Sequence, residues 1–591
     1  MKKNFQGILI SPYAIFFACA AAIFLGALHI KMFSVNALFW DEYELVDMVV
    51  NNEISLEALF RQHNEHRIFF PKLLYNTIAQ STGMNTVPVM YFSFFLVTAA
   101  YLMLMFYLFK INKTPLNVLY PVIFGLIIFN PAQSENLLWG FQISFIMAHV
   151  FSIFSIFFAQ LQMQAIGKTS SRIMYFILSV TTAIVASFSS SQGLMSWISI
   201  TLVWLLAFRK QVLKSHFFYI WIFCLFLVFI SYFNGYVKPN HHPSLTYFVA
   251  YPVKTATYLF HLLGCGLLQN TLLSVISGVV IFTAALIMLF DFLRSKELKD
   301  VFSIGLIIYG GLVCSIICIG RAGFYVQAIY FTSRYATFSL VILIGILIYI
   351  INFKQSANTK YIRDVSVYRV FNVTFAVFII FLLISAYRTV SYIAQSDVQQ
   401  ENKFIIQTYD QQPNIKITRL YPAAEVARNR LDSLRKWRYS VFLEKNNIDM
   451  GIFINDSNML SGDWISFDTK DVIKFVGDTG DPYIRIAGWA FNPATRAPLE
   501  AVYLSLNGVL YPVFYGKSRP DRRFSFRKRA LYFTGFERTI PLSVLKDGQY
   551  SIEVFGLCKD RPFHYYKIEP DITFRVNAGL VEIQASSARL P

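Results

Sequence analysis

Charge is scarce in this sequence. Only 15% of its 591 residues are Asp, Glu, Lys or Arg, whereas about a quarter are charged in an average soluble domain. Hydrophobic residues make up 55% of the chain, and its mean hydropathy is +0.49. This composition excludes an ordinary soluble multidomain protein and predicts that most of the chain lies in a lipid bilayer.

Acidic residues are scarcer than basic ones. The chain has 34 Asp and Glu against 52 Lys and Arg, a formal net charge of +18. An excess of this kind can indicate nucleic-acid binding. Here the basic residues fall in short clusters between apolar runs, which is typical of the loops of a membrane protein. We therefore expect no nucleic-acid partner.

Cysteine is also rare, with six in the chain and no paired spacing typical of a metal site. Cys314 and Cys318 are one helical turn apart in an apolar run, which indicates core residues. Cys558 is the only cysteine in the C-terminal part of the chain, so no disulfide is expected within that part.

Long apolar runs are abundant. Stretches of about 17 to 25 apolar residues are long enough to cross a bilayer, and about eleven are predicted. The first follows Lys2 and Lys3 and has no clear small-residue cleavage site, which favours an uncleaved span over a signal peptide. The approximate spans are 8–30, 87–109, 115–130, 138–162, 173–189, 194–208, 216–233, 271–293, 301–319, 335–353 and 367–387.

Every second connection between these spans is short and basic, which marks it as cytoplasmic by the positive-inside rule. An odd number of spans then places everything after about residue 388 outside. A crossing at 247–268 would put the later basic loops on the wrong side, so an interfacial or re-entrant segment is predicted there. The basic loop residues are Lys110, Lys113, Lys168, Arg172, Arg209, Lys210, Lys214, Arg294, Lys296, Lys299, Lys354, Lys360 and Arg363.

The other connections carry nearly all the unusual polar residues, including those of a long first outer loop at 31–86. Polar groups at a membrane edge are costly unless paired or hydrated, so their gathering on one side indicates a shared site. Solvated loop residues are the alternative. The polar motifs are Trp40-Asp41-Glu42, Gln62 to Arg67, Gln133 to Asn136, Ser190 to Gly193, Asn240 to His242, Arg321 and Ser333 to Tyr335.

The composition changes after about residue 390. Residues 391–465 predict a mostly helical connector, with Leu431, Leu434 and Trp437 at helical spacing. Residues 466–591 predict an extracytoplasmic β-sandwich, because short strand patterns recur there. The expected strands lie at Tyr483 to Phe491, Ala501 to Tyr515 with a hairpin turn at Asn507-Gly508, Tyr550 to Phe555 and Ile572 to Val576.

Two aromatic residues of the predicted sandwich have alternative interpretations. Trp489 and Tyr515 could stack on a sugar ring, which would give the domain a lectin-like role. Packing in the core is the other interpretation.

Asp41 and Glu42 follow the aromatic residues Phe39 and Trp40, which places two carboxylates at the predicted membrane boundary. An ionised carboxylate there can act as a general base toward a hydroxyl group. A substrate carried by a lipid would meet it at that height.

His63, Glu65, His66 and Arg67 lie in a stretch that is predicted to form an interfacial helix, in which His63 shares a face with His66 and Arg67. The cluster fits phosphate binding, orientation of the acidic pair, a metal site or structural packing. A divalent cation, Mg²⁺ or Mn²⁺, is therefore the one cofactor left open.

Arg321 and Arg334 flank the last large outer loop. A guanidinium group matches phosphate oxygens bidentately and can stabilise a phosphate leaving group. Arg334-Tyr335 would also suit an interfacial anchor. We favour the phosphate role.

Taken together, four of these motifs resemble the GT-C superfamily of polyprenyl-phosphate-sugar glycosyltransferases, in a bacterial branch that modifies O-antigen or other envelope glycans. The resemblance covers roughly residues 1–390, so these residues are expected to form a GT-C-like transmembrane catalytic domain. The C-terminal sandwich is not a constant feature of that superfamily. The motifs are Trp40-Asp41-Glu42, Gln62 to Arg67, Glu135-Asn136-Leu137-Leu138-Trp139 and Ser333-Arg334-Tyr335.

The resemblance implies that Asp41 is the catalytic base, with Glu42 as its partner or as the alternative base. It implies an undecaprenyl-phosphate-sugar donor, a glycan acceptor and an inverting displacement at the periplasmic face of the bacterial inner membrane. Arg334, with Arg321 as the second candidate, would neutralise the leaving phosphate. The expected substrate-binding residues are His63, Glu65, His66, Arg67, Glu135, Asn136, Trp139, Gln192, Arg321, Arg334 and Tyr335.

Two other functions stay open. A transporter or flippase of lipid-linked sugars should carry polar or charged residues within its spans and have pseudo-repeated halves. The sequence shows neither clearly. A non-catalytic envelope assembly or glycan-binding protein would act through the C-terminal sandwich, with the loop motifs as scaffolding.

Overall fold

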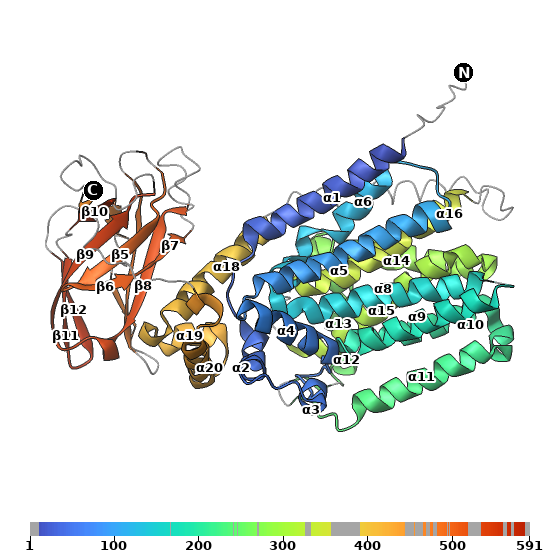
Figure 1. Cartoon of the computed structure of the whole chain (residues 1–591), viewed down its shortest axis with the longest axis horizontal. Helices are drawn as coiled ribbons and strands as arrows, with labels where there is room; N and C mark the ends of the chain where they lie inside the picture. Colours follow the sequence, from blue (N-terminus) through green and yellow to red (C-terminus); the bar gives the residue numbers. More distant parts are fainter. Residues whose placement is uncertain are drawn as a thin grey trace, which may run out of the picture. The chain divides into compact units, whose positions relative to one another are not determined.

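The computed structural model divides into two units by its contacts: Met1–Val35 with Asp47–Ser396, and Asn36–Val46 with Asp397–Pro591 (Figure 1). The short segment Asn36–Val46, which carries Asp41 and Glu42, is thus grouped with the C-terminal part of the chain. The structure describes residues 11–165, 167–239, 242–244, 246–268, 271–324, 333–355, 390–443, 454–455, 465–467, 473–476, 482–492, 495, 497–517, 533–559, 564–568 and 572–585.

The first unit is helical. Within the described residues, nine helices, some with flanking turns, are long and apolar enough to cross a bilayer. Figure 1 shows α8 and α9 side by side, and α15 also packs against α16. The membrane-length helices are α1 (Pro12–Phe33), α5 (Val87–Phe106), α8 (Ile143–Gln164), α9 (Thr169–Ser187), α10 (Leu194–Phe208), α11 (His216–Phe233), α14 (Thr271–Ser295), α15 (Val301–Arg321) and α16 (Ala336–Gln355).

One predicted span contains a helix shorter than expected, and another lies outside the described residues. The stretch 115–130 contains only the ten-residue α6 (Leu119–Ile128), which is about 15 Å long and covers half of a hydrocarbon core. The helix stops because Pro131 starts a new turn, in which the Asn130 side chain accepts from Ala132 N at 2.8 Å. The span predicted at 367–387 falls on residues that the structure does not describe.

The apolar stretch 247–268 forms two short helices, α12 (Tyr247–Ala250) and α13 (Pro252–Gly264). Its longer helix has 13 residues, about 20 Å, which is too short to cross a bilayer. This agrees with the prediction of a segment that does not span.

Glycine allows α13 and α14 to pack with their backbones in close approach. A Cβ on Gly278 would lie 1.8 Å from the carbonyl oxygen of Phe260, and one on Gly264 would lie 1.9 Å from that of Ser274. Small residues at such crossings let apolar helices associate by van der Waals contact. Gly264 and Gly278 therefore fix how α13 lies along α14.

The second unit begins with helices, as predicted for the connector. Its helices are amphipathic, and Leu431 and Leu434 are buried, whereas Trp437 is 56% exposed, so only two of the three predicted positions lie in the core. The helices are α18 (Val390–Gln407), within which the two units divide, α19 (Asn414–Leu420) and α20 (Ala424–Trp437).

The strands of the second unit form two sheets, as predicted. Most neighbours are antiparallel, and among the strands that the structure describes only β1 and β10 pair in parallel. One sheet contains β1 (Ile454–Asn455), β5 (Ala501–Leu506), β6 (Val509–Pro512), β9 (Gly548–Leu557), β10 (His564–Ile568), β11 (Ile572–Asn577) and β12 (Leu580–Ala585). The other contains β2 (Ile465–Phe467), β3 (Ile473–Val476), β4 (Tyr483–Ala490), β7 (Phe514–Lys517) and β8 (Gly535–Pro541).

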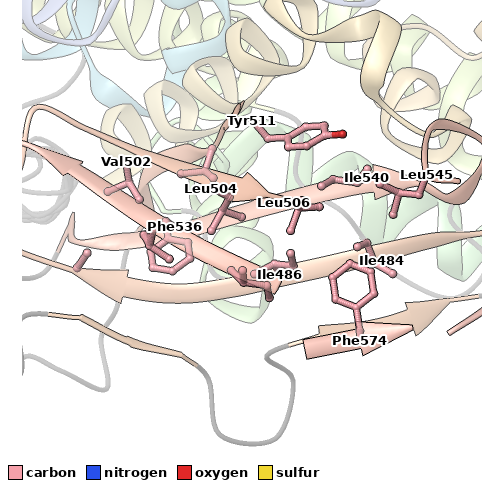
Figure 2. Packing of buried hydrophobic residues seen from close by; sticks show 14 of the residues in the cluster. Ile484, Ile486, Val502, Leu504, Leu506, Tyr511, Phe536, Ile540, Leu545 and Phe574 are labelled. Atoms are coloured by element: carbon pink, nitrogen blue, oxygen red, sulfur yellow. The ribbon is translucent and has the colours of Figure 1, made fainter. Parts of the chain in front are cut away.

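The two sheets share one hydrophobic core, to which β4 and β8 contribute from one sheet and β5, β9 and β11 from the other (Figure 2). The predicted hairpin turn is confirmed: Asn507 and Gly508 have φ of 49° and 85°, a pair of left-handed residues that joins β5 to β6. Trp489 is buried and stacks on Phe491, and the Tyr515 hydroxyl donates to Ala490 O at 2.8 Å. Both aromatics are therefore packing residues, which favours the second of their two interpretations.

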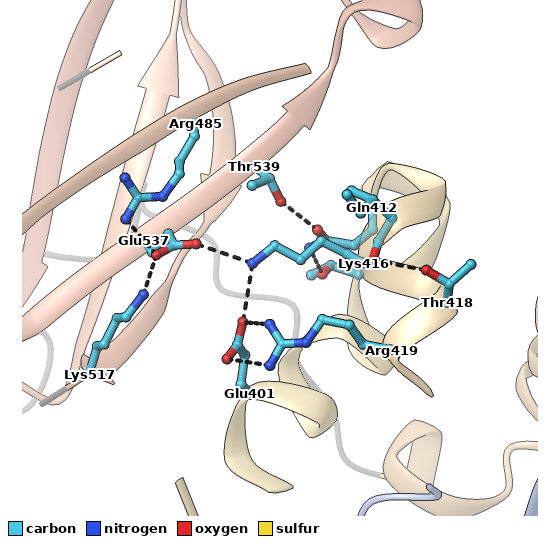
Figure 3. A network of polar contacts seen from close by, with 11 residues as sticks. Glu401, Gln412, Lys416, Thr418, Arg419, Arg485, Lys517, Glu537 and Thr539 are labelled. Atoms are coloured by element: carbon cyan, nitrogen blue, oxygen red, sulfur yellow. Dashed lines mark hydrogen bonds and ion pairs between the residues drawn. The ribbon is translucent and has the colours of Figure 1, made fainter. Parts of the chain in front are cut away.

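A buried carboxylate joins the connector helices to the sandwich (Figure 3). Glu537 of β8 accepts from Lys416 of α19 at 3.1 Å, from Arg485 of β4 at 2.9 Å and from Lys517 of β7. Lys416 also pairs with Glu401 of α18 at 3.1 Å. Burial alone would raise the pKa of Glu537, but hydrogen bonds and charge from these cations hold it well below its usual range.

Substituting Gly278 tests the close packing of α13 on α14. Gly278→Ala should lower the free energy of unfolding by about 1 to 3 kcal/mol, because the new methyl group meets backbone that cannot turn aside. Gly311→Ala is the control, since its Cβ would meet nothing within 4 Å and alanine favours a helix. Thermal unfolding of both purified variants in detergent checks this, and equal midpoints would contradict it.

Glu537→Gln tests the three ion pairs that Glu537 makes in the second unit. The change leaves three basic groups facing an amide, and we expect a loss of about 3 kcal/mol or more in unfolding free energy. Glu553→Gln removes one half-exposed pair, with Lys567 at 2.8 Å, and should cost no more than about 1 kcal/mol. Calorimetry of the two variants compares their losses of unfolding free energy, and equal losses would contradict a special role for Glu537.

Candidate functional site

The acidic pair lies in a short helical turn, η1 (Trp40–Leu45), within the second unit. Trp40 has φ of 48°, a strained conformation for a bulky residue. Glu42 is fully buried, and its carboxylate accepts from Phe39 N at 2.9 Å, which holds this turn closed. Asp41 is half-buried. The arrangement favours a structural role for Glu42 and leaves Asp41 as the candidate base.

The motif from Gln62 to Arg67 is a tight turn, so the prediction of an interfacial helix is wrong. His63 N donates to His66 O at 2.8 Å, and His66 N donates to His63 O at 2.8 Å. Asn64, at the first corner, has φ of 47°, which asparagine tolerates better than most residues. The turn places Glu65 at its tip, and the shared helical face expected for His63 and Arg67 does not exist.

Arg67 anchors this turn to the end of α11. Its guanidinium donates to the carbonyl oxygens of Phe60 at 2.7 Å, Tyr232 at 2.6 Å and Asn234. The last carbonyls of a helix lack partners within the helix and carry its negative dipole end, so a cation is well placed there. These bonds favour a structural role for Arg67 over substrate binding.

Glu65 is surrounded by three basic groups from separate parts of the first unit. Its carboxylate bonds to the guanidinium of Arg321 and lies 3.5 Å from His66 Nε2 and 3.3 Å from His242 Nε2. Burial would raise the pKa of Glu65, but the charges of His66, Arg321 and His242, with a backbone hydrogen bond, lower it to about 2. We call these four residues the Glu65 cluster.

His66 links the Glu65 cluster to the connection between α9 and α10. Ser191 N donates to His66 Nδ1 at 3.3 Å, so this nitrogen is an acceptor and the proton of a neutral ring is on Nε2, facing Glu65. Ser190 Oγ lies 3.4 Å from the same Nδ1 and donates to the side chain of Gln192. The predicted residue Gln192 therefore touches the cluster through Ser190.

A second group of predicted residues forms hydrogen bonds between two loops, the one at Glu135 and the one at Ser333. The Glu135 carboxylate accepts from Arg334 N at 2.9 Å and Ser333 Oγ at 3.1 Å, and Asn136 Nδ2 donates to Arg334 O at 2.8 Å. These bonds cap the N-terminal end of α16 and join two of the motifs that carry the family resemblance.

Two aromatic residues of these loops, Trp139 and Tyr335, lie beside Arg334. Its guanidinium carbon is 5.9 Å from the ring centre of Trp139 and 5.6 Å from that of Tyr335, distances that allow cation–π attraction. His63, which is also buried, packs on Phe141 with ring centres 4.9 Å apart.

The predicted site residues of the first unit thus fall into two groups. One is centred on Glu65, and the other lies between Glu135 and Ser333. His242 and Ser190 were recognised as polar loop residues but left out of the candidate set, because nothing in their local spacing indicates a contact with Glu65. A divalent cation at Glu65 would have to displace Arg321 from the carboxylate, which weighs against a metal at that position.

Comparison with known proteins identifies no relative. No family model, no curated protein and no solved structure matches the chain. The resemblance to the GT-C superfamily therefore remains a hypothesis drawn from the loop motifs.

Acidification tests the ion pairs of Glu65. Its pKa is lowered from 4.5 to about 2, so its pairing should stabilise the folded protein above about pH 4.5 and be lost as the pH falls toward 2. The shift corresponds to roughly 3 kcal/mol at most. Between pH 6 and 3, the thermal midpoint of the wild type should fall more steeply than that of Glu65→Gln.

The exposed Glu57 supplies the control for that experiment, because it lies in the same loop. Glu57→Gln should follow the wild-type pH profile. Parallel profiles for the wild type and Glu65→Gln would contradict the proposed charge pairing.

Proposed function

We propose that this chain is a membrane glycosyltransferase. It would move a sugar from an undecaprenyl-phosphate-linked donor to an envelope glycan such as O-antigen, on the periplasmic face of the bacterial inner membrane. The observation that carries the proposal is the Glu65 cluster, in which ionisable side chains from widely separated loops gather at helix ends opposite the basic connections.

In the proposed reaction, Asp41 accepts the proton of an acceptor hydroxyl as that oxygen attacks the anomeric carbon. The bond from this carbon to the lipid phosphate breaks, and the sugar is transferred with inversion. Arg334 or Arg321 neutralises the leaving phosphate. Glu65 would hold the Arg321 guanidinium in one orientation, and a quarter of the Arg321 side chain remains exposed, which leaves room for a phosphate oxygen to approach.

A transporter of lipid-linked sugars is the second candidate, and one observation favours it. His149 in α8, together with Gln133 and Thr337, lines a cavity between membrane-length helices. Ionisable groups at such depth often mark a transport path. The cavity is only about 20 Å³, enough for roughly one water molecule. A sugar would not fit in this cavity, and the Glu65 cluster at the helix ends supports the enzyme instead.

A glycan-binding protein without catalytic activity is the third candidate. It depended on exposed aromatic residues in the sandwich, as platforms for a sugar. Since Trp489 and Tyr515 are packing residues, this candidate loses its main support.

Mass analysis of envelope glycans tests the proposed function. Cells that carry Asp41→Asn should lose the modifying sugar, because removing a general base lowers a rate by about 10²- to 10⁴-fold. Arg334→Ala should weaken the modification for lack of charge on the leaving phosphate. Asp47→Asn, an exposed residue in the same loop, is the matched control and should leave the glycan intact.

All variants must accumulate in the membrane at wild-type levels. Normal glycans in both Asp41→Asn and Arg334→Ala would defeat the catalytic assignment.

A further inference from the structure

The segment that carries the acidic pair packs against the connector helices, with which it shares the second unit. Tyr43 is fully buried, and its ring stacks on Tyr421 with centres 5.9 Å apart and planes 29° from parallel. The Tyr421 hydroxyl donates to Glu44 at 3.5 Å. Tyr421 thus contacts Tyr43 and Glu44, the two residues that directly follow Asp41 and Glu42.

Tyr421 is itself held by the helices that flank it. It follows α19 and precedes α20, and the Arg430 guanidinium carbon of α20 lies 5.5 Å from its ring centre. Ile417 and Leu420 of α19 are fully buried, as are Leu431 and Leu434 of α20. Tyr421 therefore projects from a rigid support.

The same helices are anchored to the β-sandwich. Lys416, one turn before Leu420, pairs with Glu537 of β8, and Thr539 of β8 donates to Gln412 at 2.9 Å. Arg428 of α20 donates to the carbonyl oxygens of Tyr409 and Gln412, each at 2.6 Å. A continuous series of contacts therefore runs from the sandwich through the connector to the turn at Tyr43.

The turn needs such support because its backbone is strained. Trp40 holds a left-handed φ, and strained residues persist only where their surroundings fix them. Glu42 closes the turn from within, and Tyr43 and Glu44 tie it to Tyr421. Both supports act on the residues directly after Asp41 and so restrict the backbone at Asp41.

We infer that the C-terminal unit positions the acidic pair, with Tyr421 as a positioning residue for Asp41. The inference rests on the proposed role of Asp41 as the base. The connector and sandwich would then contribute to the reaction by holding the turn of the first outer loop that carries Asp41. They would not need a separate glycan-binding role.

Thiol labelling tests the positioning without any assumption about the reaction. The full-length protein with Asp41→Cys is treated with a soluble maleimide, and the parent protein supplies the background from the native cysteines. Adding Tyr421→Ala should change the labelling rate at position 41 several-fold, because the turn is no longer held. Tyr421→Phe keeps the stacked ring and should leave the rate close to that of Asp41→Cys alone.

The functional measurement uses the same connector variants with Asp41 intact. Tyr421→Ala should sharply reduce the fraction of envelope glycan that carries the added sugar, and Tyr421→Phe should restore most of it. Trp437→Ala, which removes an exposed aromatic from the same connector, is the control for a general disturbance and should behave as wild type.

The outcomes separate the inference from the proposed function. An unchanged labelling rate in Tyr421→Ala overturns the inference, whatever the glycans show. A changed labelling rate with fully modified glycans in Tyr421→Ala overturns the role of Asp41 as the base, and with it the proposed function.

Discussion

An ionised carboxylate at the end of an apolar helix bundle has to be neutralised by the protein itself, and Glu65 is where this chain meets that constraint. Removing a charge from water costs several kcal/mol unless partners replace the lost hydration. Arg321, His66 and His242 are those partners, and they come from different loops. Pairing one side chain therefore holds together loops that are far apart in the sequence.

The second unit solves the same problem in the same way. Glu537 is surrounded by Lys416, Arg485 and Lys517, just as Glu65 is surrounded by three basic groups. In a chain with 52 Lys and Arg and only 34 Asp and Glu, basic partners are in excess and each buried acid can collect several. The position of each buried acidic residue therefore determines where helices, strands and loops meet, because several basic side chains gather around it. This is why the loss of one acid should matter more than the loss of one base.

The sequence predicted those features that depend on local pattern. Apolar runs located the long helices, and Asn507-Gly508 located a hairpin turn, because length and left-handed φ are properties of a few adjacent residues. Pro131 was a local signal as well, but the hydropathy of 115–130 concealed it, and the helix there is shorter than the predicted span. The turn at His63 to His66 was read as a helix since its charged residues fit helical spacing, while the left-handed Asn64 carried the contrary signal.

Contacts between distant segments were beyond local pattern. Nothing around His242 indicates that it faces Glu65, and nothing around Tyr421 indicates that it stacks on Tyr43, 378 positions earlier in the numbering (421 − 43). Polar loop residues were expected to gather on one side, and part of that set does meet. Which residues bind a substrate and which hold the loops was undecidable from the motifs, because Arg67 and Glu135 have the chemistry of ligands and the contacts of structural ties.

The two members of the acidic pair show how position separates residues of like chemistry. Glu42 is buried and bonded to the backbone of Phe39, so its carboxylate maintains the turn and is a poor acceptor for a substrate proton. Asp41, the next residue toward the strained Trp40, is half-buried in the same turn. A base needs a fixed direction as well as a negative charge, since proton transfer requires hydrogen-bond geometry. If Asp41 is the base, as we propose, Glu42 fixes the direction of its neighbour by closing the turn, and Tyr421 of the connector supports the same turn through Tyr43 and Glu44.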